Sequence, residues 1–157
     1  NVNNEEKLFN SPNYYGSIDY NQFIKLNNRI TSRIGINALT TINDNLFENE
    51  LTRIGGYQSL RGFDEESIFV SSYLIGNFEF RFLLDRKSNV FVFSDIAWTE
   101  KKINSSYSEQ SYNSVGIGTN FSVNNGMLTI IYALGRETNI PFVLKTIKIH
   151  PGFNSYF

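Results

Sequence analysis

Apolar and polar residues alternate with a period of two along almost the whole chain, and few segments show a helical period. In one such segment, for example, Ile30, Ile34 and Ile36 share one parity, and Thr31 and Arg33 share the other. Side chains on a strand point alternately to its two faces, so each predicted strand has one apolar and one polar face. The alternation predicts an all-β, antiparallel fold with seven strands, at 16–26, 29–42, 69–84, 90–99, 112–123, 128–134 and 143–157.

The connections between these strands alternate in length. Short turns are expected at 27–28, 85–89 and 124–126, and longer polar loops at 43–67, 100–111 and 137–142. This alternation, with an apolar outer face and a polar, Gly-rich inner face, is typical of a transmembrane β-barrel of the outer membrane. Strands in lipid must close on themselves, because no water satisfies an unpaired backbone group. The alternative is a soluble antiparallel sandwich or a lipocalin-like barrel, whose apolar face would point inward.

The number of predicted strands indicates an incomplete barrel. Bacterial barrels normally have an even number of strands, whereas an open sheet of seven leaves two exposed edges. The polar stretch 1–16 has neither the basic nor the apolar region of a signal peptide, and it resembles an interrupted loop. We therefore expect residues 1–157 to be the C-terminal part of one outer-membrane barrel domain, with upstream strands and periplasmic domains missing.

Composition narrows the functional classes. The 14 Lys and Arg residues nearly balance the 15 Asp and Glu residues, so no basic surface for nucleic acid is expected. The chain has no cysteine for a thiolate metal site, and its single histidine, His150, lies near the chain end. Nucleophile-elbow, zinc-protease and P-loop motifs are missing. The sequence predicts no enzyme, no catalytic residue, no metal and no cofactor.

The longest predicted loop contains the stretch 54–67, IGGYQSLRGFDEES, which we call the arginine loop. Gly55, Gly56 and Gly62 bracket Arg61 and Phe63. Glycine permits positive φ and close backbone approach, so a sharply bent loop with an arginine at its tip is expected. A guanidinium carries five donors and keeps its charge, so this tip requires acceptors from elsewhere in the chain.

Several motifs resemble the BamA/TamA family of outer-membrane proteins, within the bacterial surface antigen superfamily. The sequence S-L-R-G-F at 59–63 is similar to the R-G-F/Y signature of the family's sixth extracellular loop. F-E-F-R at 78–81 resembles the strand that follows, and F-S-D-I-A at 93–97 resembles F-x-D-x-G, with Ala97 in place of the glycine. Residues 114–118 and 126–128 resemble the next strand and its turn. The resemblance covers roughly 17–157 and implies seven strands of a barrel of about sixteen.

In that family the loop folds back into the barrel lumen, where its arginine pairs with acidic residues of the inner wall. The resemblance therefore implies a loop–lumen clamp of Arg61, Gly62 and Phe63 with Glu79 and Asp95. Parity points the same way, because both acidic residues lie on the polar face of adjacent predicted strands. The alternative is that these three charges are ordinary exposed side chains.

The last predicted strand contains I-H-P-G-F at 149–153. Proline cannot donate to a strand ladder, and glycine can kink the strand. In the family the first and last strands meet at a weakly paired seam through which substrate strands are thought to enter. Pro151, Gly152 and the terminal Phe157 are accordingly the expected residues of a lateral seam and terminal strand. The alternative is a bulge near the periplasmic end, and Ser155 stands where the family's terminal signal has a hydrophobic residue.

The resemblance implies a factor of the bacterial outer membrane that assembles or inserts other membrane proteins by offering a seam to an incoming strand. Its partners would be the lipid bilayer of the outer membrane, unfolded or nascent outer-membrane proteins, and periplasmic or lipoprotein accessory subunits. Two alternatives remain: a protein-transport pore of the two-partner secretion type, and a barrel anchor of a patatin-like hydrolase. Upstream domains would distinguish the three.

Overall fold

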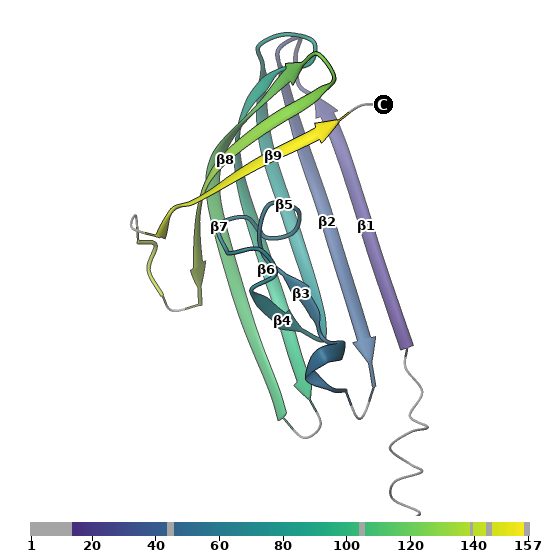
Figure 1. Ribbon diagram of the computed structural model, residues 1–157. Helices are drawn as coiled ribbons and strands as arrows, with labels where there is room; N and C mark the ends of the chain where they lie inside the picture. Colours follow the sequence, from purple (N-terminus) through teal and green to yellow (C-terminus); the bar gives the residue numbers. More distant parts are fainter. Residues whose placement is uncertain (1–13, 44–45, 104–105, 139, 144–145, 156–157) are drawn as a thin grey trace, which may run out of the picture.

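The computed structural model describes residues 14–43, 46–103, 106–138, 140–143 and 146–155. Its main element is an antiparallel sheet of seven strands in the order β1-β2-β5-β6-β7-β8-β9, and β3 and β4 form a separate hairpin (Figure 1). A short 3-10 helix, η1, spans Glu48–Glu50, and no helix among the described residues is long and apolar enough to cross a membrane. The strands are β1 Tyr14–Lys25, β2 Ile30–Ile42, β3 Thr52–Ile54, β4 Ile68–Val70, β5 Ser72–Leu83, β6 Asn89–Ile103, β7 Ser106–Val123, β8 Gly126–Glu137 and β9 Lys148–Ser155.

Two of the short turns are built on the same side-chain contact. In the β1–β2 turn, Asn27 Oδ1 accepts the backbone N–H groups of Arg29 and Ile30 at 2.8 and 2.9 Å. In the β5–β6 turn, Asp85 Oδ1 accepts the two corresponding N–H groups, both at 2.7 Å. Asn and Asp favour turns because their side chains bond to backbone two or three residues on. These contacts reverse the chain tightly and keep consecutive strands adjacent.

The two faces of the sheet differ as the alternation predicts. The apolar face is convex and exposed, and it carries side chains with exposed fractions between 39% and 60%: Ile34, Ile36, Leu74, Phe78, Phe80, Phe82, Val92, Ile96, Trp98, Ile117 and Phe121. On the opposite, concave face the charged residues Glu79 and Asp95 are buried, with exposed fractions of 2% and 0%. The distribution is inverted relative to a soluble sandwich, in which the apolar face would be buried.

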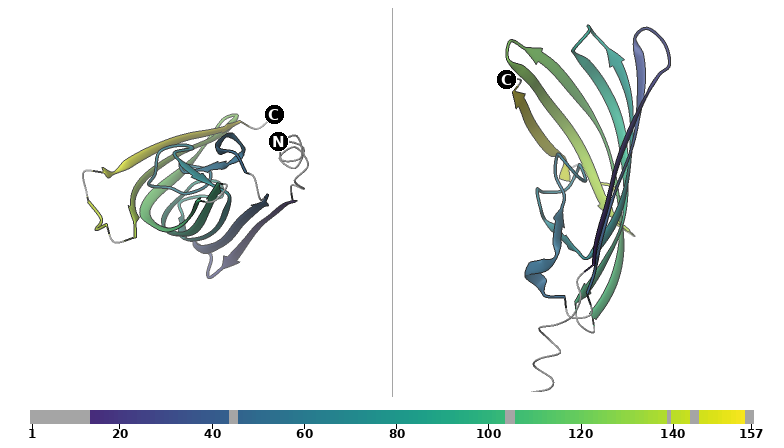
Figure 2. Two further views of the ribbon diagram at one scale, coloured as in Figure 1. Left: turned by 90° about the horizontal axis from the view of Figure 1, so that it is seen from below. Right: turned by 90° about the vertical axis from the view of Figure 1, so that its right-hand side faces the viewer.

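The segment between β2 and β5 lies on the concave side, and the sheet curves around it (Figure 2). Its apolar side chains pack on the inward-facing residues of β5, β6 and β7, forming one core cluster of Ile54, Leu60, Val70, Ile75, Ala97 and Tyr112. The sequence predicts a polar concave face. In the structure this face is not uniformly polar. It carries a small apolar core wherever this segment covers it.

The sheet is open, and the described strands do not form a closed barrel. β1 and β9 are its edges, because each pairs with only one neighbour. Every residue of β1 is exposed, on both faces. The count of seven strands in the main sheet agrees with the prediction, and closure and membrane embedding stay predictions.

Four predicted segments differ in the structure. The predicted loop at 43–67 contains η1 and β3, and the predicted strand at 69–84 is divided into β4 and β5. The predicted loop at 100–111 is wrong: β6 extends to Ile103 and β7 begins at Ser106, with Glu100 opposite Glu109 and Lys102 opposite Tyr107. A backbone ladder continues wherever the two strands stay in register, whatever the polarity of the side chains. The last strand begins at Lys148 rather than near Val143.

Candidate functional site

The arginine loop bends most sharply at three glycines. Gly55, Gly56 and Gly62 have φ values of +117°, +89° and +91°, a region that side chains with a Cβ rarely adopt. Gly62 also meets the backbone of β8, since a Cβ at this position would lie 2.7 Å from the nitrogen of Gly135. A side chain at Gly62 or at Gly135 would separate the loop from β8, so both of these glycines are required for the close approach.

Arg61 is buried at the tip of this loop, with an exposed fraction of 5%. Its Nε donates to Asp95 Oδ2 at 2.9 Å and its Nη2 donates to Asp95 Oδ1 at 2.5 Å, which makes a bidentate pair. Its Nη1 donates to Glu79 Oε1 at 2.6 Å. The guanidinium also lies 3.7 Å from the ring centre of Phe93. We call Arg61, Glu79 and Asp95 the clamp.

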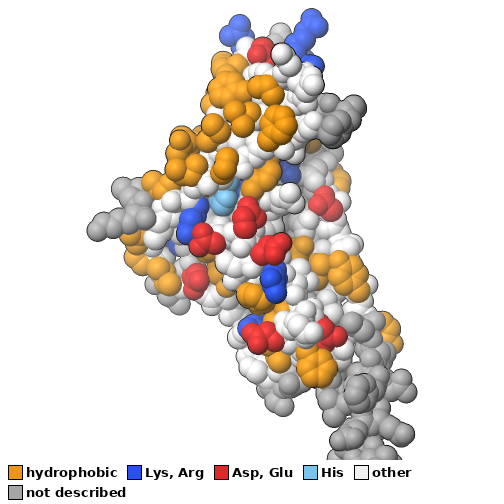
Figure 3. Space-filling model, viewed as in Figure 1, with side chains coloured by type: hydrophobic (Ala, Val, Ile, Leu, Met, Phe, Trp, Pro, Cys, Tyr) orange, Lys and Arg blue, Asp and Glu red, His pale blue; other side chains and the backbone are white. Residues whose placement is uncertain are grey.

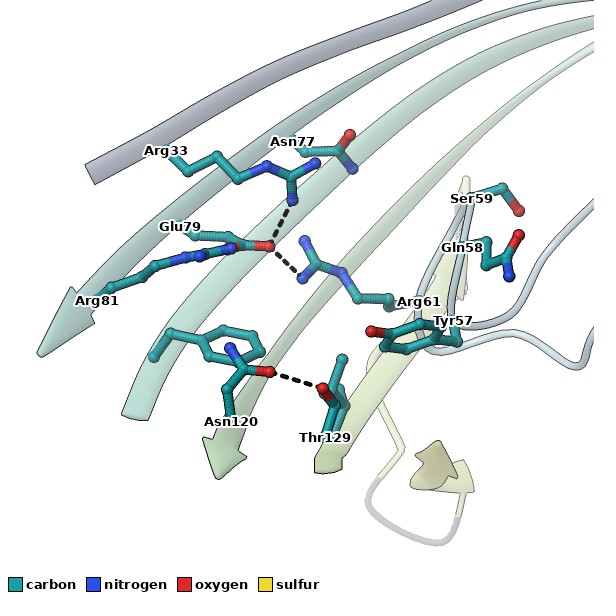
Figure 4. Close-up of a pocket in the computed structure, with 12 residues that line it drawn as sticks. Arg33, Tyr57, Gln58, Ser59, Arg61, Asn77, Glu79, Arg81, Asn120 and Thr129 are labelled. Atoms are coloured by element: carbon teal, nitrogen blue, oxygen red, sulfur yellow. Dashed lines mark hydrogen bonds and ion pairs between the residues drawn. The ribbon is translucent and has the colours of Figure 1, made fainter. Parts of the chain in front are cut away.

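Glu79 is shared by three arginines (Figure 4). Arg33 Nη1 donates to the same Oε1 at 2.8 Å, and Arg81 Nε donates to Oε2 at 2.8 Å. Arg33 and Arg81 are more open than Arg61, with side-chain exposures of 24%, 21% and 6%. Their guanidiniums come from β2 and β5, whereas Arg61 comes from the loop. The carboxylate thus joins the sheet to the loop by charge-assisted hydrogen bonds.

Asp95 is held by polar groups of neighbouring strands as well. Asn77 Nδ2 donates to its Oδ1 at 2.9 Å, and Ser114 Oγ donates to its Oδ2 at 3.3 Å. The backbone N–H of Arg61 donates to the same Oδ2 at 3.3 Å. Among the described residues, every buried side-chain nitrogen or oxygen has a hydrogen-bond partner. The buried charges of the clamp are therefore fully paired, which buried ions require.

The electrostatics of the clamp keep the arginine charged. Burial alone lowers the pKa of Arg61, but the hydrogen bonds and negative charges of Asp95 and Glu79 outweigh it and raise that pKa overall. The guanidinium therefore stays protonated at any pH at which the chain is folded. The loop is held by a permanent cation, and its attachment at this point does not depend on the protonation of the arginine.

A polar cavity of about 260 Å³ lies beside the clamp (Figure 4). Its lining includes Tyr57, Gln58, Ser59, Asn77 and Asn120 as well as the three arginines and Glu79. These groups can bind and orient polar ligands, but the lining has no histidine or cysteine to pair with Ser59 as a nucleophile. In the described part of the chain, no three His, Cys, Asp or Glu side chains are grouped as metal ligands would be.

The loop residues after Arg61 also make the contacts that fix its path. The ring of Phe63 meets that of Tyr112 edge-on, with centroids 5.3 Å apart and planes at 86°. The backbone N–H of Gly62 donates to His150 Nε2 at 3.3 Å, and Lys148 Nζ lies 2.7 Å from Asp64 Oδ1. The structure thus brings together all five residues expected in the clamp region, and it places them on the concave face of an open sheet.

Two of the three residues expected at the seam, Pro151 and Gly152, lie on the edge strand β9. Pro151 is opposite Ile130 in the β8–β9 ladder, and Gly152 is opposite Thr129. A Cβ on Gly152 would lie 3.2 Å from the ring of Tyr57, so the arginine loop packs directly against this strand. Phe157 lies outside the described residues.

Three residues of the site were not singled out from the sequence. Arg33 and Arg81 lie on the polar parity of their strands, and the register that sets Arg33 opposite Glu79 was needed to find them. His150 was set aside as a lone histidine near the chain end, yet it is buried, with an exposed fraction of 6%. Its inward parity on the last strand was the available signal.

Charged side chains cover the middle of the concave side, over the arginine loop, and hydrophobic side chains lie over β8 and β9 (Figure 3). Comparison of the chain with models of protein families, with curated proteins and with solved structures found no match. What supports a function is consequently the geometry itself: the clamp, the exposed apolar face and the two sheet edges.

Proposed function

We propose that this chain is the C-terminal part of an outer-membrane β-barrel that assembles or inserts other outer-membrane proteins, as its resemblance to the BamA/TamA family implies. One observation carries the proposal: the sheet exposes its apolar face and buries the ion pairs of the clamp. Extended apolar patches on a protein surface mark contacts with membranes or partners. A row of exposed Phe, Ile and Val side chains across β2, β5, β6 and β7 suits the acyl chains of a bilayer.

Edge strand β9 supports the assembly role. It pairs with β8 over eight residues, Lys148–Ser155, whereas the other strands of the main sheet have 12 to 18 residues. Pro151 removes one backbone donor from this strand. A short edge with a free row of backbone groups can accept an incoming strand by β-augmentation. The substrates would then be unfolded or nascent outer-membrane proteins, with periplasmic or lipoprotein subunits assisting.

The clamp supports this role by rigidity and does no covalent chemistry. Arg61 ties the arginine loop to β5 and β6 through two buried carboxylates. Removing one member of a buried, hydrogen-bonded ion pair leaves an unpaired charge, which destabilises by about 3–5 kcal/mol. The clamp would keep the inner wall ordered while the edge of the sheet exchanges partners.

The proposal is tested by depleting the full-length protein from its cell and quantifying the other barrel proteins in the outer-membrane fraction. We expect a general loss of these barrels, reproduced by Arg61→Ala and not by the matched control Arg86→Ala. Arg86 is exposed in the β5–β6 turn and has no part in the clamp. If the other barrels stay at normal levels while one secreted protein or a lipid-hydrolysing activity is lost, the secretion pore or the hydrolase anchor replaces the assembly role.

A further inference from the structure

The arginine loop is bonded on both of its sides. One side meets β5 and β6 through the clamp, and the other meets the edge strand β9 through residues that the clamp does not include. We propose that loop residues 62–65 form a latch that holds β9 on the sheet, with His150 as the positioning residue through which the latch acts. In addition to its pairing with β8, strand β9 is held toward the concave side of the sheet by its contacts with this loop.

The central contact of the latch is the hydrogen bond from Gly62 N–H to His150 Nε2, at 3.3 Å. Because Nε2 accepts, it carries no proton, so the neutral ring has its proton on Nδ1. Nδ1 lies 3.9 Å from Glu65 Oε1, so the loop faces both nitrogens of the ring. The imidazole is buried, and its position therefore follows the position of the loop.

Three further contacts join the same loop to the last two strands. Lys148 Nζ lies 2.7 Å from Asp64 Oδ1, at the start of β9. The ring of Tyr57 packs against Gly152, and the backbone of Gly62 packs against Gly135 of β8. Each contact is lost if the loop lifts away. The opposite edge strand, β1, is exposed along its whole length, so no equivalent cover holds it.

The latch and the clamp share one short segment, so they are mechanically coupled. Arg61 and Gly62 are consecutive: one is bonded to Asp95 and the other to His150. Loosening either side frees the loop to move on the other. For its purpose this inference depends on the proposed function, since a latch on β9 would set how readily that edge opens to an incoming strand.

The latch is also sensitive to protonation. A protonated ring carries N–H at both nitrogens, so it cannot accept from Gly62 and that bond is lost. Burial of the imidazole opposes its protonation, as do the positive charges of Lys148 and Arg61, whereas the carboxylates of Glu65 and Asp64 favour it. Protonation moves the ring from the Gly62 backbone toward the Glu65 carboxylate, and the hold on β9 weakens as the pH falls.

Hydrogen exchange of the full protein in lipid nanodiscs tests the latch, with rates expressed as protection factors so that intrinsic pH effects cancel. In His150→Leu we expect protection at residues 148–152 to fall roughly five- to tenfold, the worth of one or two hydrogen bonds. His150→Gln supplies a new acceptor and should restore most of that protection. Unchanged protection of β6 and β7 shows that the variant is folded.

A glycine pair provides a test that leaves every charged group in place. In Gly135→Ala the new methyl group would lie 2.5 Å from the oxygen of Gly62, so the loop must lift and β9 should again lose protection. Gly76→Ala is the matched control, because a Cβ there meets no atom within 4 Å, and it should leave β9 unchanged. Unaltered β9 protection in both His150→Leu and Gly135→Ala overturns the latch.

The pH arm uses the unmodified chain and so does not depend on any variant folding. Protection of β9 should fall as the pH drops below about 6.5, the ordinary pKa of histidine, and His150→Gln should abolish that fall. An equal fall in His150→Gln overturns the role of His150. Outer-membrane barrel levels are measured in parallel. Loss of β9 protection with normal barrel levels upholds the latch and refutes the proposed function, and the reverse result refutes the latch alone.

Discussion

Edge strand β1 and the wall formed by β6, β7 and β8 are built from the same alternating pattern, yet the wall is covered and β1 is not. Every residue of β1 is exposed. In the wall the inward-facing residues Phe91, Phe93, Ile131 and Ala133 have exposed fractions of 5% or less. The difference comes from the segment between β2 and β5, which lies over the wall and does not reach β1 (Figure 2).

This contrast separates two properties that alternation alone does not distinguish. Parity decides which face a side chain occupies, and the loop decides whether that face is buried. Glu79 shows both situations at one oxygen atom, because Oε1 accepts from Arg61 under the loop and from Arg33 on the open side. Arg61 and Arg33 carry the same guanidinium group but differ in burial. Substituting each in turn therefore measures how much burial under the loop contributes to stability.

The largest effect is expected from Arg61→Ala. The substitution leaves two buried carboxylates without their main cation, so the free energy of unfolding should fall by about 3–5 kcal/mol. Arg33→Ala removes a partly exposed ion pair, worth about 0.2–1 kcal/mol. Urea titration of the folded protein in lipid measures both, with the slope m reporting whether the extent of unfolding is unchanged. Equal losses would show that the loop adds nothing to the burial of the clamp.

A smaller effect is expected from the threonine pair Thr129 and Thr40. Thr129 Oγ1 donates at 2.7 Å to Asn120 Oδ1, and Asn120 Nδ2 donates at 3.0 Å to Asn89 Oδ1, in a buried row across β6, β7 and β8. Thr129→Val leaves an amide oxygen without its donor and should cost about 1–3 kcal/mol. Thr40 bonds to Ser72 on the exposed face, so Thr40→Val should change stability by about 0.5 kcal/mol or less.

The same unfolding measurement compares the two threonine variants directly. A cost for Thr40→Val that matches that of Thr129→Val would contradict the contrast between the buried concave face of the wall and the exposed face of the sheet. Valine has nearly the shape of threonine, so the comparison reports the hydroxyl group and not a change of packing volume.

The order of strands and their faces follow from local information, and the exact extent of strands does not. Alternation of neighbouring residues identifies the exposed face of β5 and β6. The polar composition of residues 100–111 predicts a loop. In the structure Glu100 and Glu109 lie opposite each other, and the hydroxyl of Tyr107 lies within hydrogen-bonding distance of both carboxylates. Whether such a segment forms a strand depends on its pairing with the neighbouring strand, which its own residues do not reveal.

The residues of the candidate site likewise fall into those that the sequence predicts and those that it does not. Arg61, Glu79 and Asp95 were found because a motif and strand parity both mark them. His150 was not found because its bond to Gly62 joins residues 88 positions apart, through the curvature that brings β9 over the loop. Glycine contacts such as that of Gly62 with Gly135 depend on the same curvature. Contacts between distant strands follow from the bending of the sheet, which no short stretch of sequence specifies.

The smallest effect is expected at the β1–β2 and β5–β6 turns. Both turns have the same side-chain-to-backbone hydrogen bonds, accepted by a neutral Asn27 in one and by a charged Asp85 in the other. The backbone N–H groups of Lys87 and Ser88 donate to the Asp85 carboxylate and hold its pKa below its ordinary value. A carboxylate with a lowered pKa stabilises the fold above its unfolded pKa and loses that contribution as the pH falls through the folded pKa. Asn27 makes the same two bonds without a charge, so its contribution is independent of pH.

Asp85→Asn should therefore keep the turn and lose its response to acid. We expect a slightly lower midpoint of thermal unfolding than in the native chain at neutral pH, and no difference once the pH falls below the folded pKa of Asp85. Asn27→Asp should introduce the same acid response into the β1–β2 turn. Because the Asp85 side chain is exposed, the shift is small and is read from thermal unfolding of both variants against the native chain across the acid range. An acid response as large in Asp85→Asn as in the native chain would contradict the role of the Asp85 carboxylate, because the turn would then contribute nothing to the acid stability of the sheet.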